Sequence, residues 1–174
     1  MRPSYSEGVR RVLSHAQAAA GRDHHRYVHT EYLLIGLLQE RNSATGILKA
    51  LGFDRRSLLR ECEAQCHRGK NGKEPGLRLT TRTQEAMTLA EKEATAQQEA
   101  KVDTAHVLIG LLLESEGKAG SLLRTAGVSV EAIRAALVKK ETATEPSASQ
   151  PQQRQKEATS PPARKPLWKL LLRV

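Results

Sequence analysis

Residues 29–40 read HTEYLLIGLLQE, and residues 103–114 read DTAHVLIGLLLE. The two stretches lie 74 residues apart and are identical at seven of their twelve positions. Each has a Thr near its start, whose hydroxyl can cap the first turn of a helix. Each then runs through Leu and Ile for longer than a typical strand. Because an internal repeat constrains the whole fold, we predict a buried helix, capped by Thr30 or Thr104, in each half of a duplicated domain.

Gly36 and Gly110 occupy the same position in the two copies. Inside a helix, Gly costs about 1 kcal/mol relative to Ala. Its occurrence at both positions therefore predicts a close helix crossing in each half.

The rest of the chain follows the same plan of short helices with apolar residues at helical spacing. We predict an all-α fold, an eight-helix bundle of two four-helix repeats related by pseudo-twofold symmetry. The domain covers residues 1–138, with repeats at about 4–66 and 79–138 and a flexible linker at 67–76. Predicted helix caps are Ser6, Asn42, Asp54, Thr80 or Thr81, and Ser129, and predicted stops are Gly52 and Gly127.

The composition agrees with packed helices, because 39% of the residues are hydrophobic but only 3% are aromatic. No segment has the about 20 apolar residues of a membrane span. The first residues lack the apolar core of a signal peptide, so we expect a cytoplasmic protein.

Residues 139–174 form a basic tail with eight Lys or Arg and three Asp or Glu, and therefore carry much of the net charge of +9. Residues 141–163 are rich in Pro, Ser, Thr and Gln, which predicts disorder. The end of the tail is both apolar and basic. We predict that Trp168, Leu170 and Leu171 dock on a partner.

Glu31 is the strongest candidate for a binding residue. It follows Thr30 in the first turn of the predicted helix, where the helix dipole favours a carboxylate. It is either simply an acid at a helix start or an exposed carboxylate that receives a guanidinium. The second copy has Ala105 instead, so such a site would be asymmetric.

Cys62, Cys66 and His67 could belong to a metal site, but the sequence lacks the second pair of ligands that zinc signatures contain. Two reduced cysteines are the simpler interpretation, and His24 and His25 belong to a polar connector. No nucleophile motif, metalloprotease motif or phosphate-binding loop is present. We therefore predict no metal, no cofactor and no enzymatic activity.

These features resemble the Clp N-terminal repeat domain of the Clp/Hsp100 unfoldases such as ClpA and ClpC. The resemblance covers about residues 4–138 and rests on elements that occur twice. These elements are YSE at 5–7 and LTT at 79–81, TEY at 30–32 and TAH at 104–106, and the Leu-Leu-Ile-Gly-Leu-Leu helix. The resemblance implies an all-α module that binds substrates and adaptor proteins.

In ClpC-like members this domain recognises phosphorylated arginine. Carried over, the resemblance implies one ligand-binding site at Ser6, Thr30 and Glu31, and a degenerate second site at Thr80, Thr104 and Ala105. Gly8 stands where the family often has a basic side chain.

The 174 residues contain no ATPase module. The resemblance therefore implies a non-enzymatic accessory module whose partners are Clp subunits, adaptors or tagged substrates, with no nucleic acid expected. One alternative is a binder of nucleic acid or anionic membranes that acts through the basic tail. Another is an enzyme of unfamiliar chemistry.

Overall fold

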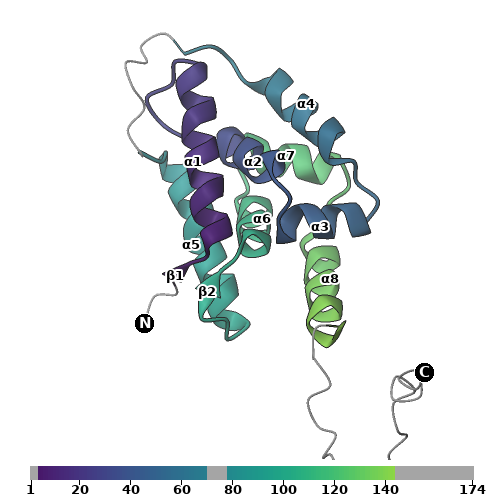
Figure 1. Ribbon diagram of the computed structural model, residues 1–174. Coiled ribbons are helices and arrows are strands. Elements are labelled where there is room, and N and C mark those ends of the chain that lie inside the picture. The colour runs from purple at the N-terminus through teal and green to yellow at the C-terminus, as the bar shows by residue number, and fades with distance from the viewer. Residues whose placement is uncertain (1–3, 70–77, 144–174) are drawn as a thin grey trace, which may run out of the picture. The chain divides into compact units, whose positions relative to one another are not determined.

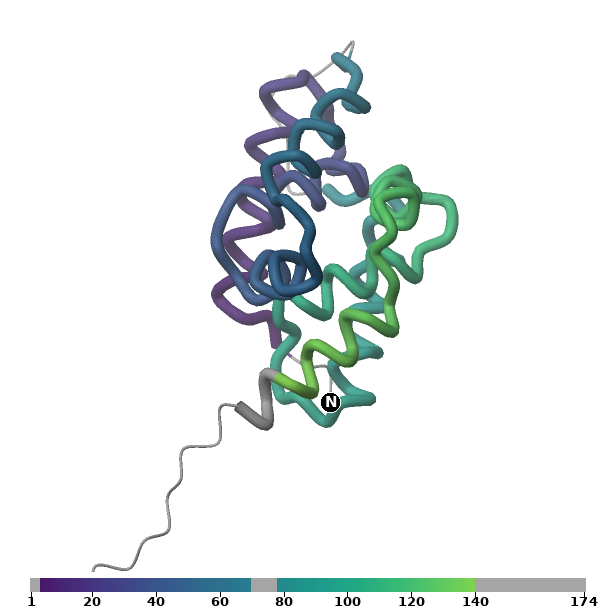
Figure 2. The backbone as a smooth tube through the Cα atoms, turned by 90° about the vertical axis from the view of Figure 1, so that its right-hand side faces the viewer, coloured from purple at the N-terminus to yellow at the C-terminus, as the bar shows by residue number. Residues whose placement is uncertain are grey.

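A computed structural model describes residues 4–69 and 78–143 (Figure 1). These residues form eight α-helices and two short strands, which confirms the all-α prediction. The first repeat holds β1 (Ser4–Tyr5), α1 (Glu7–Arg22), α2 (Thr30–Gln39), α3 (Ser43–Ala50) and α4 (Arg55–Gln65). The second holds α5 (Thr81–Ala96), β2 (Lys101–Val102), α6 (Thr104–Leu113), α7 (Lys118–Thr125) and α8 (Val130–Ala143). In Figure 2 the first repeat, purple to blue, lies beside the second, teal to green.

The predicted helix boundaries depend mostly on local caps, and five of these caps are confirmed. The side chains of Ser6, Asn42, Asp54, Thr80 and Ser129 each accept a hydrogen bond from a backbone N–H in the first turn that follows.

The predicted stops are confirmed as well. Gly52 and Gly127 have φ angles of 88° and 91°, the left-handed conformation that ends a helix and that Gly adopts at little cost.

The prediction that Thr30 and Thr104 cap the core helices is wrong. The N-caps are His29 and Asp103, and both threonines lie within the first turn. The Thr104 hydroxyl instead accepts a hydrogen bond from the Ala44 N–H at 3.3 Å, so it stabilises the first turn of α3 in the other repeat. The Thr104 hydroxyl therefore makes a tertiary contact with α3, and it does not cap its own helix.

The two repeated stretches form the core of the domain. Every residue of α2 from Thr30 to Leu38 is buried, as is every residue of α6 from Thr104 to Leu112. The two helices contact each other, and each also packs closely against the first helix of its own repeat, α1 or α5.

Both core glycines lie at close helix crossings, as predicted. A Cβ at Gly36 would collide with the backbone of α1 at Val12, and a Cβ at Gly110 would collide with the backbone of α5 at Ala86. Only hydrogen fits at these two positions.

Backbone hydrogen bonds connect the segment that precedes the first helix of each repeat to the segment that precedes the core helix of the other repeat. β1 pairs in parallel with β2, and the Ser6 N–H donates to the Val102 carbonyl at 2.9 Å. The equivalent contact in the other half is the Thr80 N–H, which donates to the Val28 carbonyl at 3.1 Å. The start of α1 therefore lies beside the start of α6, and the start of α5 lies beside the start of α2.

The end of the domain differs from the predicted boundary at residue 138, because α8 continues to Ala143. Residues 139–143 include Lys and Glu, which are good helix formers. The rest of the predicted tail, with Trp168, Leu170 and Leu171, lies outside the described residues. Most of the predicted linker lies outside them too. In the described part of the chain, no helix has the length and apolar character needed to cross a membrane.

Candidate functional site

A pocket of about 270 Å³ lies where the starts of three helices meet. Because each helix start carries partial positive charge and unpaired N–H groups, such a meeting point favours an anion. The pocket is lined by His29, Thr30 and Glu31 at the start of α2, Thr80 and Arg82 at the start of α5, Gly117 and Lys118 at the start of α7, and His25 and His67.

Glu31 supplies a carboxylate to this pocket. The residue is 8% exposed, and one carboxylate oxygen accepts a hydrogen bond from the Thr30 hydroxyl at 3.3 Å. The other lies 3.8 Å from the ammonium of Lys118, whose side chain is half exposed. The Cys62 thiol donates to the Glu31 carbonyl at 3.3 Å and so connects α4 to this turn. Glu31 is therefore held in place with a cation beside it.

Arg82 supplies a second cation at the rim of the pocket. Its guanidinium donates to the side chain of Glu116 at 2.7 Å and to the Glu116 carbonyl at 2.8 Å. Both side chains are more than half exposed, so this pair contributes little to stability. A ligand with a stronger negative charge can therefore compete for Arg82.

A second carboxylate lies behind the wall of the pocket. Glu114 is 3% exposed, and one of its oxygens accepts from the Glu116 N–H at 3.1 Å. Its other oxygen has no hydrogen-bond partner among the described residues and lies against Gly117. A Cβ at Gly117 would collide with this oxygen and would lie 3.0 Å from the Thr30 hydroxyl. Glycine therefore lets the buried Glu114 side chain approach the Glu31 side of the pocket.

The histidines of the pocket are held by neighbouring groups. His25 Nε2 lies 2.6 Å from the His67 carbonyl oxygen, and the His25 ring contacts those of His29 and Tyr32. Burial lowers the pKa of His29, and the nearby Glu31 carboxylate opposes this only in part. The lowered pKa favours the neutral form of the His29 ring, and Arg82 and Lys118 are the cationic side chains of the pocket.

The grouping of site residues predicted from sequence is wrong in one respect. Ser6 does not lie with Thr30 and Glu31, because its hydroxyl donates to the Asp103 carboxylate at 3.1 Å at the start of α6. Thr80 takes the corresponding place beside Glu31. The reason is that the first helix of each repeat starts beside the core helix of the other repeat.

Ser6, Gly8, Thr104 and Ala105 belong to the second location. Thr104 and Ala105 are fully buried, and a Cβ at Gly8 would lie 3.2 Å from the Thr104 methyl group. Neither Gly8 nor Ala105 has a charged side chain. The missing cation and the missing carboxylate thus fall in the same place, and the Glu31 pocket keeps both charges.

Sequence reasoning missed Arg82 and Lys118. Arg82 lies 74 residues after Gly8, so the repeat offset could have identified it as the basic residue of the other site. Lys118 carried no such signal, because only the packing of α7 on α2 brings it to Glu31.

Neither cysteine is arranged as a reactive nucleophile. Burial raises the pKa of the Cys62 thiol, and burial together with Glu31 raises that of Cys66 to about 11. Among the described residues no group of three or more His, Cys, Asp or Glu is arranged to hold a metal ion.

Comparison with known proteins identifies the class of this domain. The family model of the Clp repeat (R) N-terminal domain matches residues 4–79 and 78–167. The chain therefore belongs to the Clp repeat N-terminal domain family, a family of protein-interaction modules.

Similar sequences occur in longer bacterial proteins. The chain is 33% identical over 131 residues to the negative regulator of genetic competence ClpC/MecB of Bacillus subtilis. It is 31% identical over 131 residues to the chaperone protein ClpB of Oceanobacillus iheyensis. Both alignments cover 75% of this chain and only 16% of the relative, so the chain spans a small part of the length of these proteins.

Solved structures share the fold at low sequence identity. The Hsp104 N-terminal domain of Candida albicans has a TM-score of 0.68 at 15% identity, over 81% of this chain and 93% of that one. A complex of the ClpV N-domain with a VipB peptide has a TM-score of 0.62 at 16% identity, over 81% and 86% of the two chains.

Proposed function

We propose that this chain is a non-enzymatic binding module of the Clp proteolytic system that recognises protein substrates or adaptors through the Glu31 pocket. The observation that carries this proposal is the presence of one carboxylate and two cations at the meeting point of three helix starts. Such a pocket suits a group that carries a positive and a negative charge side by side. The cytoplasmic location stays a prediction.

Phosphoarginine on a protein is such a group. Its guanidinium would bind the Glu31 carboxylate, with charge-assisted hydrogen bonds. Its phosphate would lie toward Lys118, Arg82 and the start of α5, where cations and helix N–H groups favour an anion. The Glu31–Lys118 contact of 3.8 Å is loose enough for a ligand to replace it.

The family relationship supports a polypeptide as the ligand. One structural neighbour, the ClpV N-domain, was solved in complex with a VipB peptide. That observation belongs to ClpV, and it supports the proposal because the two domains share a fold. The partners we propose are tagged substrates, adaptors or Clp subunits.

Calorimetric titration of the full chain with a phosphoarginine peptide tests this proposal. We expect the wild-type chain to bind it and to bind the same peptide with unmodified arginine much more weakly. Glu31→Gln removes the charge that receives the guanidinium and should weaken binding by at least about tenfold, since a hydrogen bond to a charged group contributes about 1.5–3 kcal/mol. Lys118→Met should weaken it by a similar factor through the phosphate.

Glu131→Gln is the matched control, because Glu131 is also an acid in the first turn of a helix, α8, and is exposed. Its affinity should equal that of the wild-type chain. Equal affinity of the wild-type chain for the modified and unmodified peptides, or full binding by Glu31→Gln, would contradict the proposal.

A further inference from the structure

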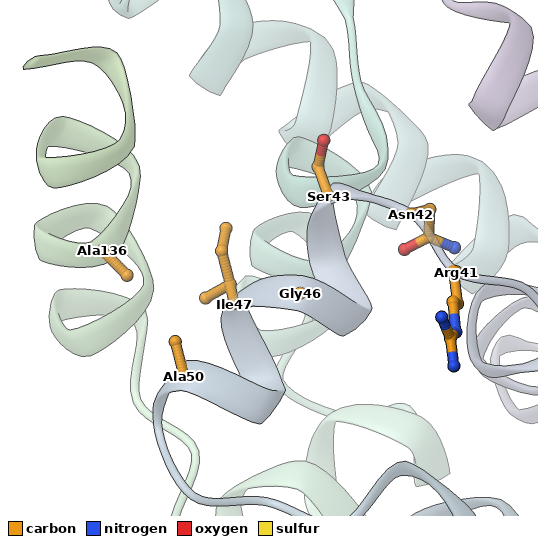
Figure 3. A pocket seen from close by; sticks show the side chains of 7 residues that line it. All are labelled: Arg41, Asn42, Ser43, Gly46, Ile47, Ala50 and Ala136. Atoms are coloured by element: carbon orange, nitrogen blue, oxygen red, sulfur yellow. The ribbon is translucent and has the colours of Figure 1, made fainter. Parts of the chain in front are cut away.

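An apolar groove lies between α3 and α8, away from the Glu31 pocket, with which it shares no lining residue. Its volume is about 430 Å³. Figure 3 shows Ile47 and Ala50 of α3 and Ala136 of α8 directed into the space between the two helices. Ile47 is only 4% exposed, so Ala50, which is exposed, and Ala136, which is half-buried, form the part of this wall that a partner can reach.

A second hollow, of about 380 Å³, continues from the first across Arg41, Asn42 and Gly46. It is lined further by Lys49 and, at the start of α4, by Arg55 and Arg56. The two hollows adjoin at these shared residues and are together called the α3 groove, with an aliphatic end and a basic end.

The charge at the basic end is not neutralised within the domain. Arg41, Lys49 and Arg56 are exposed and form no ion pair with another described residue. Asp54 is the only acid that lines the hollow, and its carboxylate accepts from the N–H groups of Arg56 and Ser57. Three cations thus remain available to a partner.

Arg55 has a structural role at the same end. Its guanidinium donates to the carbonyls of Leu38 and Gln39 at 2.9 Å, where it satisfies the last turn of α2. It is therefore not counted among the available cations.

Gly46 lies at the middle of the groove and has no structural explanation inside the domain. It lies in the interior of α3, where Gly is unfavourable, yet a Cβ there would meet no atom within 4 Å. This contrasts with Gly36 and Gly110, where a Cβ would collide with backbone. The equivalent fourth residue of α7 is Ser121, so the helix itself does not require Gly. Gly46 is exposed and lines both hollows, so the missing side chain leaves the surface between them open.

From these observations we propose that the α3 groove binds an acidic amphipathic segment of a partner protein. The apolar face of the segment packs on Ala50, Ala136 and the small exposed edge of Ile47, and its carboxylates meet Arg41, Lys49 and Arg56. This is the usual arrangement of a helix bound in a groove. A nucleic acid would use the cations but leave the aliphatic wall unmatched. The groove is thus a second binding surface, which can be occupied together with the Glu31 pocket.

A fluorescent synthetic peptide tests this inference with the full chain. The probe is a peptide of about 18 residues, long enough to form a helix when bound, with Leu at i, i+3 and i+4 spacing and Glu elsewhere. A second probe has Lys in place of every Glu. In fluorescence anisotropy titrations, we expect the acidic probe to bind and its affinity to fall as salt is added, and we expect the Lys probe not to bind.

Gly46→Glu places a carboxylate between the two hollows and should weaken binding of the acidic probe by at least about tenfold. Ser121→Glu is the matched control, because it adds the same charge at the equivalent exposed position of α7 and should change the affinity by less than about twofold. Circular dichroism melting curves should show both variants folded, since neither side chain enters the core.

Two results would overturn the inference. One is equal binding of the acidic and Lys probes, or equal affinities of Gly46→Glu and Ser121→Glu for the acidic probe. The other is tighter binding of poly(uridylic acid) than of the acidic probe, which would assign the cations to nucleic acid. The phosphoarginine titration uses neither probe, so each proposal can fail without the other.

Discussion

The start of α2 and the start of α6 come from the same repeated sequence, yet they differ in chemistry. At α2, the Glu31 carboxylate lines a pocket together with Arg82 and Lys118. At α6, the equivalent position is Ala105, and the position equivalent to Arg82 is Gly8. The second location therefore lacks the equivalents of Glu31 and Arg82, although the Asp103 carboxylate lies there and accepts from the Ser6 hydroxyl.

This difference shows how a duplicated domain can change one site without changing the other. Each location combines the first helix of one repeat with the core helix of the other. The substitutions at Gly8 and Ala105 lie in different repeats, but they meet in space. We therefore propose that the second location does not bind the ligand of the Glu31 pocket, while the shared core keeps both repeats folded.

Gly36→Ala and Gly110→Ala test the close helix crossing that the two repeats have in common. In each case the new Cβ would collide with the backbone of the facing helix, which must move. We expect each variant to lower the free energy of unfolding by about 3 kcal/mol, at the upper end for overpacked cores. Urea unfolding followed by circular dichroism measures this. A large loss in one variant and none in the other would show that the two crossings are not equivalent.

Arg82→Ala and Gly8→Arg test whether Arg82, and not Gly8, lies at the same location as Glu31. Arg82→Ala should weaken phosphoarginine binding by about tenfold, or about 1.4 kcal/mol, because a cation beside the phosphate is lost. Gly8→Arg should leave the affinity of the Glu31 pocket within about twofold, since residue 8 lies at the other location. Calorimetry of both variants gives the answer. Stronger binding by Gly8→Arg would contradict this placement and would indicate that Gly8 and Ser6 lie at the Glu31 pocket.

An ion pair found in the second repeat gives a smaller effect. Arg134 donates to both oxygens of Glu93 at 2.7 Å and holds the pKa of that carboxyl below its usual value. At the equivalent positions the first repeat has Ala19 and Leu59. Arg134→Ala should cost about 1 kcal/mol at pH 7, since Glu93 is nearly buried but the Arg134 side chain is 48% exposed.

The pH dependence of this cost has a definite sign. A lowered carboxyl pKa stabilises the fold above the ordinary pKa of Glu, and this stabilisation is lost as the pH falls through the lowered value. The difference between wild type and Arg134→Ala should therefore shrink at pH 3, as measured by urea unfolding at both pH values. An equal difference at both would indicate that Arg134 acts through packing alone.

The smallest effect is expected at Gly46. Gly46→Ala should raise the free energy of unfolding by about 0.5–1 kcal/mol, because Ala is the better helix former and the new methyl group meets no neighbour. Ser121→Ala, at the equivalent position of α7, should give a smaller gain. A loss of stability in Gly46→Ala would mean that position 46 is packed against a neighbour in solution.

Much of the fold could be read from local sequence, because caps, stops and apolar spacing act over a few residues. Ser6, Asp54, Thr80 and Ser129 cap the helices that follow them, and Gly52 ends α3. The repeated Leu-Leu-Ile-Gly-Leu-Leu segment identified the two core helices and their close crossings.

The candidate site depended on contacts between distant parts of the chain, which local spacing does not encode. Sequence identified Thr30 and Glu31, but it joined them to Ser6. The pairing of each repeat's first helix with the other repeat's core helix brings Thr80 and Arg82 there instead. The sequence by itself determined the helices and their buried faces, because these follow from residue type and spacing. Only the tertiary structure decided which charges share a pocket, because that depends on how the repeats cross.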